Sequence, residues 1–146
     1  MPLVRIDALK ADAERLHALG RAVHDALGET LGFPPDDLFQ VLTSHDGTRG
    51  TIRYDDYLGV RRDDDIVFVG ITLRAGRPDE QKRALYRRIA ELAHAYAGTE
   101  PRNVLVTLTE NQSIDWSFGD GVAQYAPGEA EVVGPVDAMP YADREA

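Results

Sequence analysis

The chain has 146 residues, 43% hydrophobic and 28% charged, which is typical of one globular domain. Its net charge of −9 argues against nucleic acid as a partner, because phosphate binding needs a basic surface. The sequence has no cysteine, no signal-peptide pattern and no apolar run long enough for a membrane span, so we expect a cytoplasmic protein without disulfides or membrane contact.

The first half of the chain predicts a strand, a helix, a turn and a second strand. Leucine and valine recur at helical spacing up to Leu31, and Gly32 follows, a residue type favoured just past a helix end. Two prolines and two aspartates then form a typical turn sequence. We place the strands over residues 3–7 and 38–45, the helix between Asp12 and Gly32, and the turn over residues 34–37.

The second half begins after a polar loop over residues 46–65, in which we predict a hairpin with a short strand over residues 51–54. Residues 65–73 form the most apolar run and predict a buried central strand. A helix should follow Pro78, with Asp79 and Glu80 near the positive end of its dipole, and end at Gly98. We further predict a strand over residues 103–109, an irregular segment over 111–121, a short strand over 122–125 and an acidic tail rich in proline and glycine over 126–146.

The two halves match at a shift of 66 residues, which maps Gly32 onto Gly98 and Leu19 onto Leu85 without a gap. Each half is a βαβ unit, whose strands should be parallel. We therefore expect an α+β fold over residues 1–125, with a four-stranded sheet, both helices on one face, and short hairpin strands. The other face should be apolar and uncovered, which predicts an oligomer.

Pro2 is the first candidate for chemistry, because removal of Met1 would make it an N-terminal secondary amine. Such an amine has a free lone pair and can act as a base, an acid or a nucleophile. Proline at this position is also common without any such role.

Arg74 and Arg77 lie at the end of the central strand, where they can clamp a carboxylate. If the two halves run antiparallel, this strand end lies beside Pro2. Asp37 begins the strand after the first helix and could hydrogen-bond the Pro2 nitrogen. Arginines would lower the pKa of the amine, whereas a carboxylate would raise it. Solvated arginines and an aspartate that merely caps its turn are the alternatives.

Trp116 and Phe118 lie on the irregular segment and could line an apolar pocket or belong to the core. No histidine has metal-ligand spacing, and no phosphate or dinucleotide fingerprint is present. We expect neither a metal nor a cofactor.

The proline behind Met1, the paired βαβ units and the arginines before the second helix resemble the tautomerase superfamily. Within it, residues 35–40, 79–82 and above all 110–119 are similar to the malonate semialdehyde decarboxylase branch. This resemblance implies a homotrimer without cofactor, with Pro2 as the catalytic amine and Asp37, Arg74 and Arg77 as its partners. It also implies that Trp116 and Phe118 line the substrate pocket.

The spacing of the two arginines departs from that branch and is more similar to the cis-3-chloroacrylic acid dehalogenase branch. However, Thr107 stands where that branch has a tyrosine, and its glutamate has no match here. We therefore expect a decarboxylase of a small 3-oxo acid, in which Asp37 keeps Pro2 cationic, with hydratase or tautomerase side activity. The alternatives are a keto–enol tautomerase, a dehalogenase or hydratase of a small unsaturated carboxylic acid, and a non-catalytic trimeric binding protein.

Overall fold

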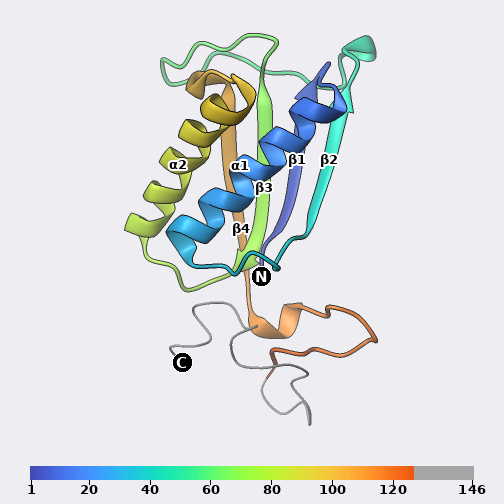
Figure 1. The fold of residues 1–146 in the computed structure, drawn as a ribbon, viewed down its shortest axis with the longest axis vertical. Helices are drawn as coiled ribbons and strands as arrows, with labels where there is room; N and C mark the ends of the chain where they lie inside the picture. The colour runs from blue at the N-terminus through green and yellow to red at the C-terminus, as the bar shows by residue number, and fades with distance from the viewer. Residues whose placement is uncertain (127–146) are drawn as a thin grey trace.

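A computed structural model describes residues 1–126 of the chain. The elements follow the order strand, helix, strand in each half (Figure 1). They are β1 (Leu3–Leu9), α1 (Ala13–Leu31), β2 (Gln40–His45), β3 (Val67–Arg74), α2 (Asp79–Ala97) and β4 (Val104–Asn111), with single 3-10 turns at Thr48–Gly50, Pro101–Asn103 and Ser113–Asp115.

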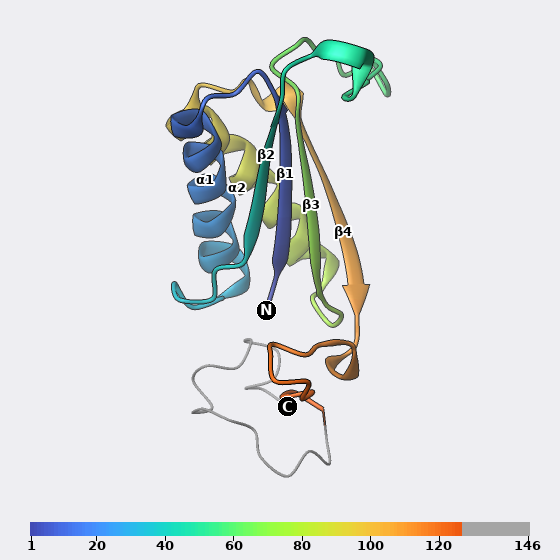
Figure 2. The ribbon, with the colours of Figure 1, turned by 90° about the vertical axis from the view of Figure 1, so that its right-hand side faces the viewer.

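The four strands form one sheet in the order β2-β1-β3-β4. β1 pairs in parallel with β2, β3 pairs in parallel with β4, and the central β1–β3 pair is antiparallel. Both helices lie on one face of this sheet, and no helix of residues 1–126 covers the other (Figure 2). The predicted fold class is confirmed in these respects.

The internal duplication is visible in the element bounds. α1 and α2 both have 19 residues, and the shift of 66 carries Ala13–Leu31 onto Asp79–Ala97. Both helices end at a glycine in the left-handed conformation, Gly32 with φ 76° and Gly98 with φ 68°, which a side chain would disfavour.

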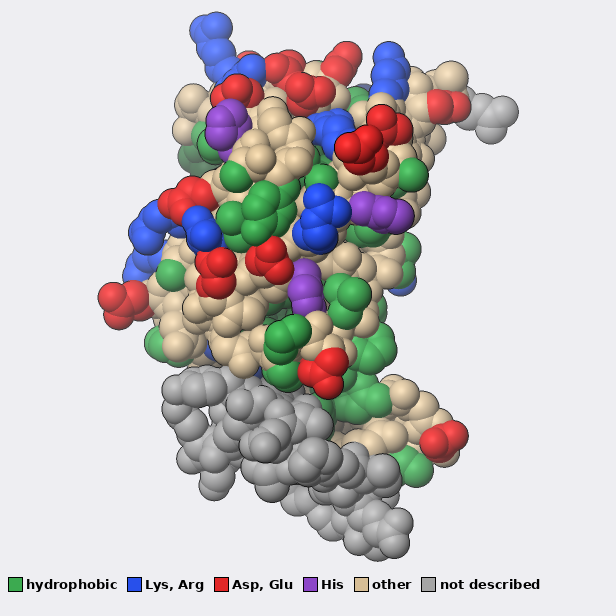
Figure 3. Space-filling view, in the orientation of Figure 1, with side chains coloured by type: hydrophobic (Ala, Val, Ile, Leu, Met, Phe, Trp, Pro, Cys, Tyr) green, Lys and Arg blue, Asp and Glu red, His purple; other side chains and the backbone are tan. Residues whose placement is uncertain are grey.

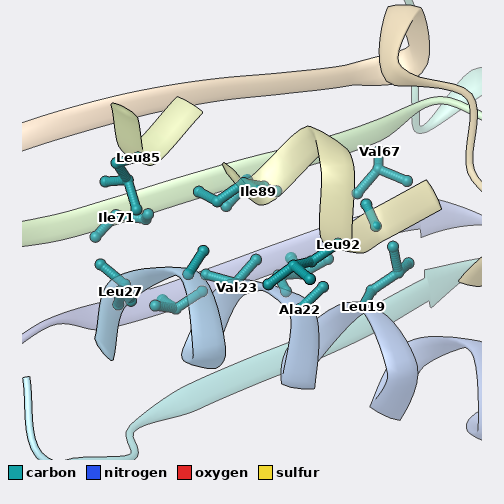
Figure 4. Packing of buried hydrophobic residues seen from close by; sticks show 14 of the residues in the cluster. Leu19, Ala22, Val23, Leu27, Val67, Ile71, Leu85, Ile89 and Leu92 are labelled. Atoms are coloured by element: carbon teal, nitrogen blue, oxygen red, sulfur yellow. The ribbon is translucent and has the colours of Figure 1, made fainter. Parts of the chain in front are cut away.

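The core lies between the helices and the sheet. Alternate residues of β1 and β3 point at the helices, as the two-residue period of a strand requires. They pack against the apolar stripes of α1 and α2 (Figure 4). Charged side chains are spread over the outer face of the helices (Figure 3). Labelled members of the core are Leu19, Ala22, Val23, Leu27, Val67, Ile71, Leu85, Ile89 and Leu92.

The uncovered face of the sheet is less apolar than the sequence pattern predicts. Its exposed Val41 and Leu105 are accompanied by Arg5 and by a hydrogen bond between His45 Nε2 and Asp7 Oδ1 at 2.8 Å. Thr43, Thr72, Thr107 and Thr109 share the same face by strand alternation. The prediction of an apolar face is therefore met only in part, because Phe68 and Leu105 lie opposite each other there while threonines and charged residues occupy other positions.

Two local predictions are also wrong. The segment 51–54 is not a strand, and the predicted hairpin is reduced to a single bridge between Tyr57 and Val60. Residues 122–125 form turns, because the chain curls back there and pairs with no strand. Ala126, assigned to the tail, is buried, while the rest of that segment, 127–146, lies outside the described residues, so the division at residue 125 stays a prediction. No helix within residues 1–126 is long and apolar enough to cross a membrane.

Candidate active site

The sheet register brings the start of the chain between two strand ends that carry charged residues. In the antiparallel β1–β3 pair Leu3 lies opposite Thr72, so extending the register by two residues sets Met1 opposite Arg74. In the parallel β1–β2 pair Val4 lies opposite Gln40, which sets Met1 beside Asp37. The marked N-terminus lies at this end of the sheet in both views (Figures 1 and 2).

The terminal amine of Met1 lies 3.5 Å from Asp37 Oδ2, and Pro2 behind it is buried. Burial is the main cause that lowers the pKa of this amine from 8.0 to about 5. Asp37 acts in the opposite direction, and Arg77 and Arg74 lower the pKa further. Burial also raises the pKa of the Asp37 carboxyl, which is 6% exposed. With Met1 in place, desolvation therefore outweighs the carboxylate and favours the neutral form of the Met1 amine. The expectation that Asp37 keeps Pro2 cationic concerns the protein without Met1 and stays a prediction.

Arg77 is fixed on two sides and unpartnered on a third. Its Nη1 donates to the backbone oxygen of Arg74 at 2.6 Å, and its guanidinium lies 4.8 Å from the ring centre of Phe33. Its Nε and Nη2 atoms are buried and have no hydrogen-bond partner among the described residues. These two groups form one edge of the guanidinium, the edge that binds a carboxylate with two parallel hydrogen bonds.

Arg74 ends β3 and is oriented by the segment that follows β4. Its Nη1 donates to Ser113 Oγ at 3.1 Å. The backbone N–H of Ala75 donates to the backbone oxygen of Asn111 at 2.8 Å. The side-chain Oδ1 of the same Asn111 accepts a hydrogen bond from Trp116 Nε1 at 2.6 Å. Asn111 thus connects the arginine turn to the tryptophan.

Three aromatic side chains form a continuous wall next to these charges. The rings of Trp116 and Phe118 are stacked with centroids 5.6 Å apart, and Phe118 meets Tyr125 edge to face at 4.8 Å. Tyr125 interacts electrostatically with both Asp37 and Arg74, and burial raises the pKa of its hydroxyl. The wall therefore extends from Trp116 to the charged cluster.

The opposite end of the duplicated fold lacks this arrangement. The shift of 66 maps Asp37 onto Asn103, and it maps Arg74 and Arg77 onto Ala8 and Ala11. Asn103 is fully buried and exchanges two hydrogen bonds with Asp63. Asn103 Nδ2 donates to Asp63 Oδ1 at 2.9 Å, and the backbone N–H of Asp63 donates to Asn103 Oδ1 at 3.0 Å. At that end the chain runs on through the loop that carries Asp63, so no terminal amine lies there. Of the two equivalent ends of the duplicated fold, one therefore carries the charged cluster with the terminal amine, and the other carries a hydrogen-bonded asparagine and aspartate instead.

Sequence patterns of two families, each described as a tautomerase enzyme, match residues 37–119 and residues 2–61 of the chain. Two probable tautomerases of Bacillus subtilis (strain 168) are similar over most of their length. YusQ is 39% identical over 85% of this chain and 98% of its own, and YrdN is 32% identical over 88% and 99%.

The chain belongs to the tautomerase superfamily.

It is therefore an enzyme of the isomerase or lyase type. Solved relatives agree with this membership. A malonate semialdehyde decarboxylase inhibited by 3-bromopropiolate superposes with a TM-score of 0.76 at 40% identity, covering 84% of this chain and 93% of its own. A second malonate semialdehyde decarboxylase, with decarboxylase and hydratase activities, has the same TM-score at 29% identity, covering 84% and 95%. A fused 4-OT that forms a symmetric trimer shares the fold at 22% identity and a TM-score of 0.69, covering 86% and 98%.

All six residues singled out in the sequence lie at this end of the molecule. Asp37, Arg74 and Arg77 surround the terminal amine, and Trp116 and Phe118 reach the cluster through Tyr125. Sequence reasoning missed Tyr125, Ser113 and Phe33. Tyr125 continues the aromatic series of the irregular segment, which is a usable signal, whereas nothing in the pattern points to the other two. Within residues 1–126 no group of three or more His, Asp or Glu side chains is arranged to hold a metal ion.

We expect the pKa of the terminal amine to respond in opposite directions to the loss of its two charged neighbours. Replacing Asp37 by asparagine removes the group that raises the pKa, so the pKa should fall further below 8.0. Replacing Arg77 by methionine removes a group that lowers it, so the pKa should rise. An NMR titration of protein labelled with ¹⁵N at the terminal residue measures both shifts, and shifts of the same sign would contradict the arrangement.

Proposed function

We propose that this tautomerase-superfamily enzyme decarboxylates a small 3-oxo acid, such as malonate semialdehyde, without a cofactor, using the amine of Pro2 after removal of Met1. The observation that carries the proposal is the set of buried Asp37, Arg74 and Arg77 side chains around the start of β1, where the Met1 amine lies 3.5 Å from Asp37 Oδ2 and Pro2 is the next residue. Two solved relatives that are malonate semialdehyde decarboxylases, at 40% and 29% identity, support the substrate class. The second of them was also studied as a mutant with alanine in place of proline at its first position.

Arg77 binds the substrate carboxylate in this proposal. Its Nε and Nη2 edge is buried and unpartnered among residues 1–126, while its Nη1 and its ring contact hold it in place. Arg74, oriented by Ser113, faces the 3-oxo oxygen. Trp116, Phe118 and Tyr125 exclude water, which strengthens each of these charge interactions.

A neutral Pro2 amine would carry a lone pair for attack on the aldehyde carbon, and the burial and arginine charges that lower the pKa of the Met1 amine at this end of the sheet would favour that form. Addition followed by loss of water gives an iminium ion. The electron pair of the bond to the carboxylate then moves into the iminium, carbon dioxide leaves, and an enamine remains. Protonation at carbon and hydrolysis release the aldehyde and restore the amine.

A protonated amine that hydrogen-bonds the carbonyl oxygen is the second route open to the same cluster. Asp37 favours that form, and an anionic substrate on Arg77 would offset the arginine charge that opposes it. One positive charge about 4 Å from the developing oxyanion is worth about 4 kcal/mol at an effective dielectric near 20, or about a thousandfold in rate.

We further propose a homotrimer in the cytoplasm. The uncovered face of the sheet, with exposed Val41 and Leu105, is suited to contact with other copies. The trimeric assembly of the fused 4-OT that shares this fold is consistent with it.

Keto–enol tautomerisation of a 2-oxo acid is the second candidate, because the two curated relatives are probable tautomerases. The same amine could take a proton from one carbon atom and return it to another, with Arg77 on the carboxylate. Asp37, Arg74 and Arg77 could serve this tautomerisation in the positions that they have in the structure.

Incubation with a panel of 3-oxo and 2-oxo acids, followed by NMR of the products, tests the proposal. We expect release of carbon dioxide from malonate semialdehyde to exceed isomerisation of any 2-oxo acid in kcat/KM. Intact-mass spectrometry of the same sample should show a protein without Met1, because Pro2 is a terminal amine only after Met1 is removed. If only 2-oxo acids are turned over, the proposed decarboxylase function is wrong and the tautomerase function takes its place.

A further inference from the structure

Asp37 lies on a turn, outside the hydrogen-bond ladder of the sheet. Its backbone N–H donates to the Pro34 oxygen at 3.0 Å, and β2 begins only at Gln40. Gln40 is fixed by its pairing with Val4 and by a hydrogen bond from its Nε2 to the Gly20 oxygen at 2.8 Å. The position of the carboxylate therefore depends on what holds the turn on its other side.

His24 of α1 holds that other side. Its Nε2 lies 2.9 Å from the backbone oxygen of Pro35, and because a carbonyl only accepts, this nitrogen is the donor. α1 is anchored by buried neighbours of His24, among them Val23 and Leu27. The hydrogen bond thus joins a fixed helix to the turn two residues before Asp37.

Part of the space between the turn and the helix is unfilled. A hollow of about 380 Å³ lies between them and is lined by His24, Asp25, Gly28, Glu29, Phe33 and Pro35. The hydrogen bond of His24 spans this hollow and so limits a shift of the turn across it. The Asp37 carboxylate, 3.5 Å from the amine, is then sensitive to such a shift.

We propose that His24 is a positioning residue, which holds the turn over residues 34–37 so that Asp37 faces the terminal amine. The inference rests on the proposed function of the amine, but its effect on Asp37 is measurable without any substrate. The imidazole also lies close enough to Asp37 to lower the pKa of that carboxyl, which fits the same placement.

The experiment compares His24→Phe with His24→Gln, whose side-chain amide nitrogen can replace Nε2 as donor. The readouts are the pKa of the terminal amine by ¹⁵N NMR, kcat and KM with malonate semialdehyde, and the melting temperature. We expect His24→Phe to lower the amine pKa, as Asp37→Asn does, and to lower kcat by roughly ten- to hundredfold at nearly unchanged KM. In His24→Gln the amine pKa and kcat should both be close to those of the parent enzyme.

His17→Phe is the matched control, since His17 is exposed two helical turns earlier on α1 and should affect neither quantity. The double variant His24→Phe/Asp37→Asn should be no worse than Asp37→Asn alone, because His24 acts through Asp37. Additive losses, or a lowered melting temperature with an unchanged amine pKa, would overturn the proposal. If Asp37→Asn shifts the amine pKa but no acid is turned over, the proposed function fails and the role of His24 is still decided by the pKa.

Discussion

Replacing Arg77 by lysine should lower kcat/KM for malonate semialdehyde by about a hundredfold. Lysine keeps the positive charge but has no planar edge of two parallel N–H groups, so one bidentate carboxylate contact is lost. Hydrogen bonds to charged groups contribute about 1.5–3 kcal/mol, and each 1.4 kcal/mol is tenfold in rate. The shorter ammonium would also lose the Phe33 ring and the Arg74 oxygen that hold the guanidinium.

Arg102→Lys is the matched control for this variant. Arg102 lies at the opposite end of the sheet and pairs with Asp63 at 2.6 Å in an exposed ion pair, so its replacement should leave the kinetics unchanged. Inhibition by propanal, measured with malonate semialdehyde as the substrate, separates two effects, because an aldehyde without a carboxylate cannot be decarboxylated and cannot use Arg77. Its inhibition constant should therefore be the same in Arg77→Lys and in the parent enzyme. If Arg77→Lys stays within threefold of the parent enzyme, Arg77 does not bind the carboxylate.

The fold could be predicted closely because its signals are local and occur twice. Helical periodicity, a glycine after each helix and a constant shift of 66 residues give both βαβ units and their pairing. The loop over residues 46–65 could not be predicted in the same way. Its β-prone residues at 51–54 find no partner strand, and the contacts that hold the loop, such as those between Asp63 and Asn103, have no local sequence signal.

The positions of Asp37, Arg74 and Arg77 near the start of the chain could be predicted, because they follow from the strand order. An antiparallel β1–β3 pair brings Arg74 and Arg77 to the start of the chain, and the parallel β1–β2 pair adds Asp37. The low pKa of the Met1 amine could not be predicted, because it depends on burial, which outweighs the nearby carboxylate. Contacts such as Phe33 on Arg77 and Ser113 on Arg74 arise only from the folded loops.

Pro2→Ala is expected to lower kcat for decarboxylation by about a hundredfold or more, the usual range for loss of a positioned acid, base or nucleophile. Proline holds its nitrogen in a ring that fixes φ, whereas alanine presents a primary amine on a freely rotating bond. The new amine therefore reaches the carbonyl carbon in fewer of its conformations. Intact mass must show that Met1 is absent from both proteins, and Pro101→Ala, at the far end of the sheet, serves as the matched control.

Reductive trapping decides how the Pro2 amine acts. If a neutral nitrogen attacks the aldehyde, borohydride added during turnover should leave the reduced substrate attached to Pro2, visible by peptide mass spectrometry. A protonated nitrogen that only hydrogen-bonds the oxygen leaves no adduct, and the rate should then fall as pH rises through the amine pKa. Full activity in protein that retains Met1 would exclude the Pro2 nitrogen from either route, because it is then an amide nitrogen whose lone pair is delocalised. Full activity in Pro2→Ala would show that the proline ring is not required.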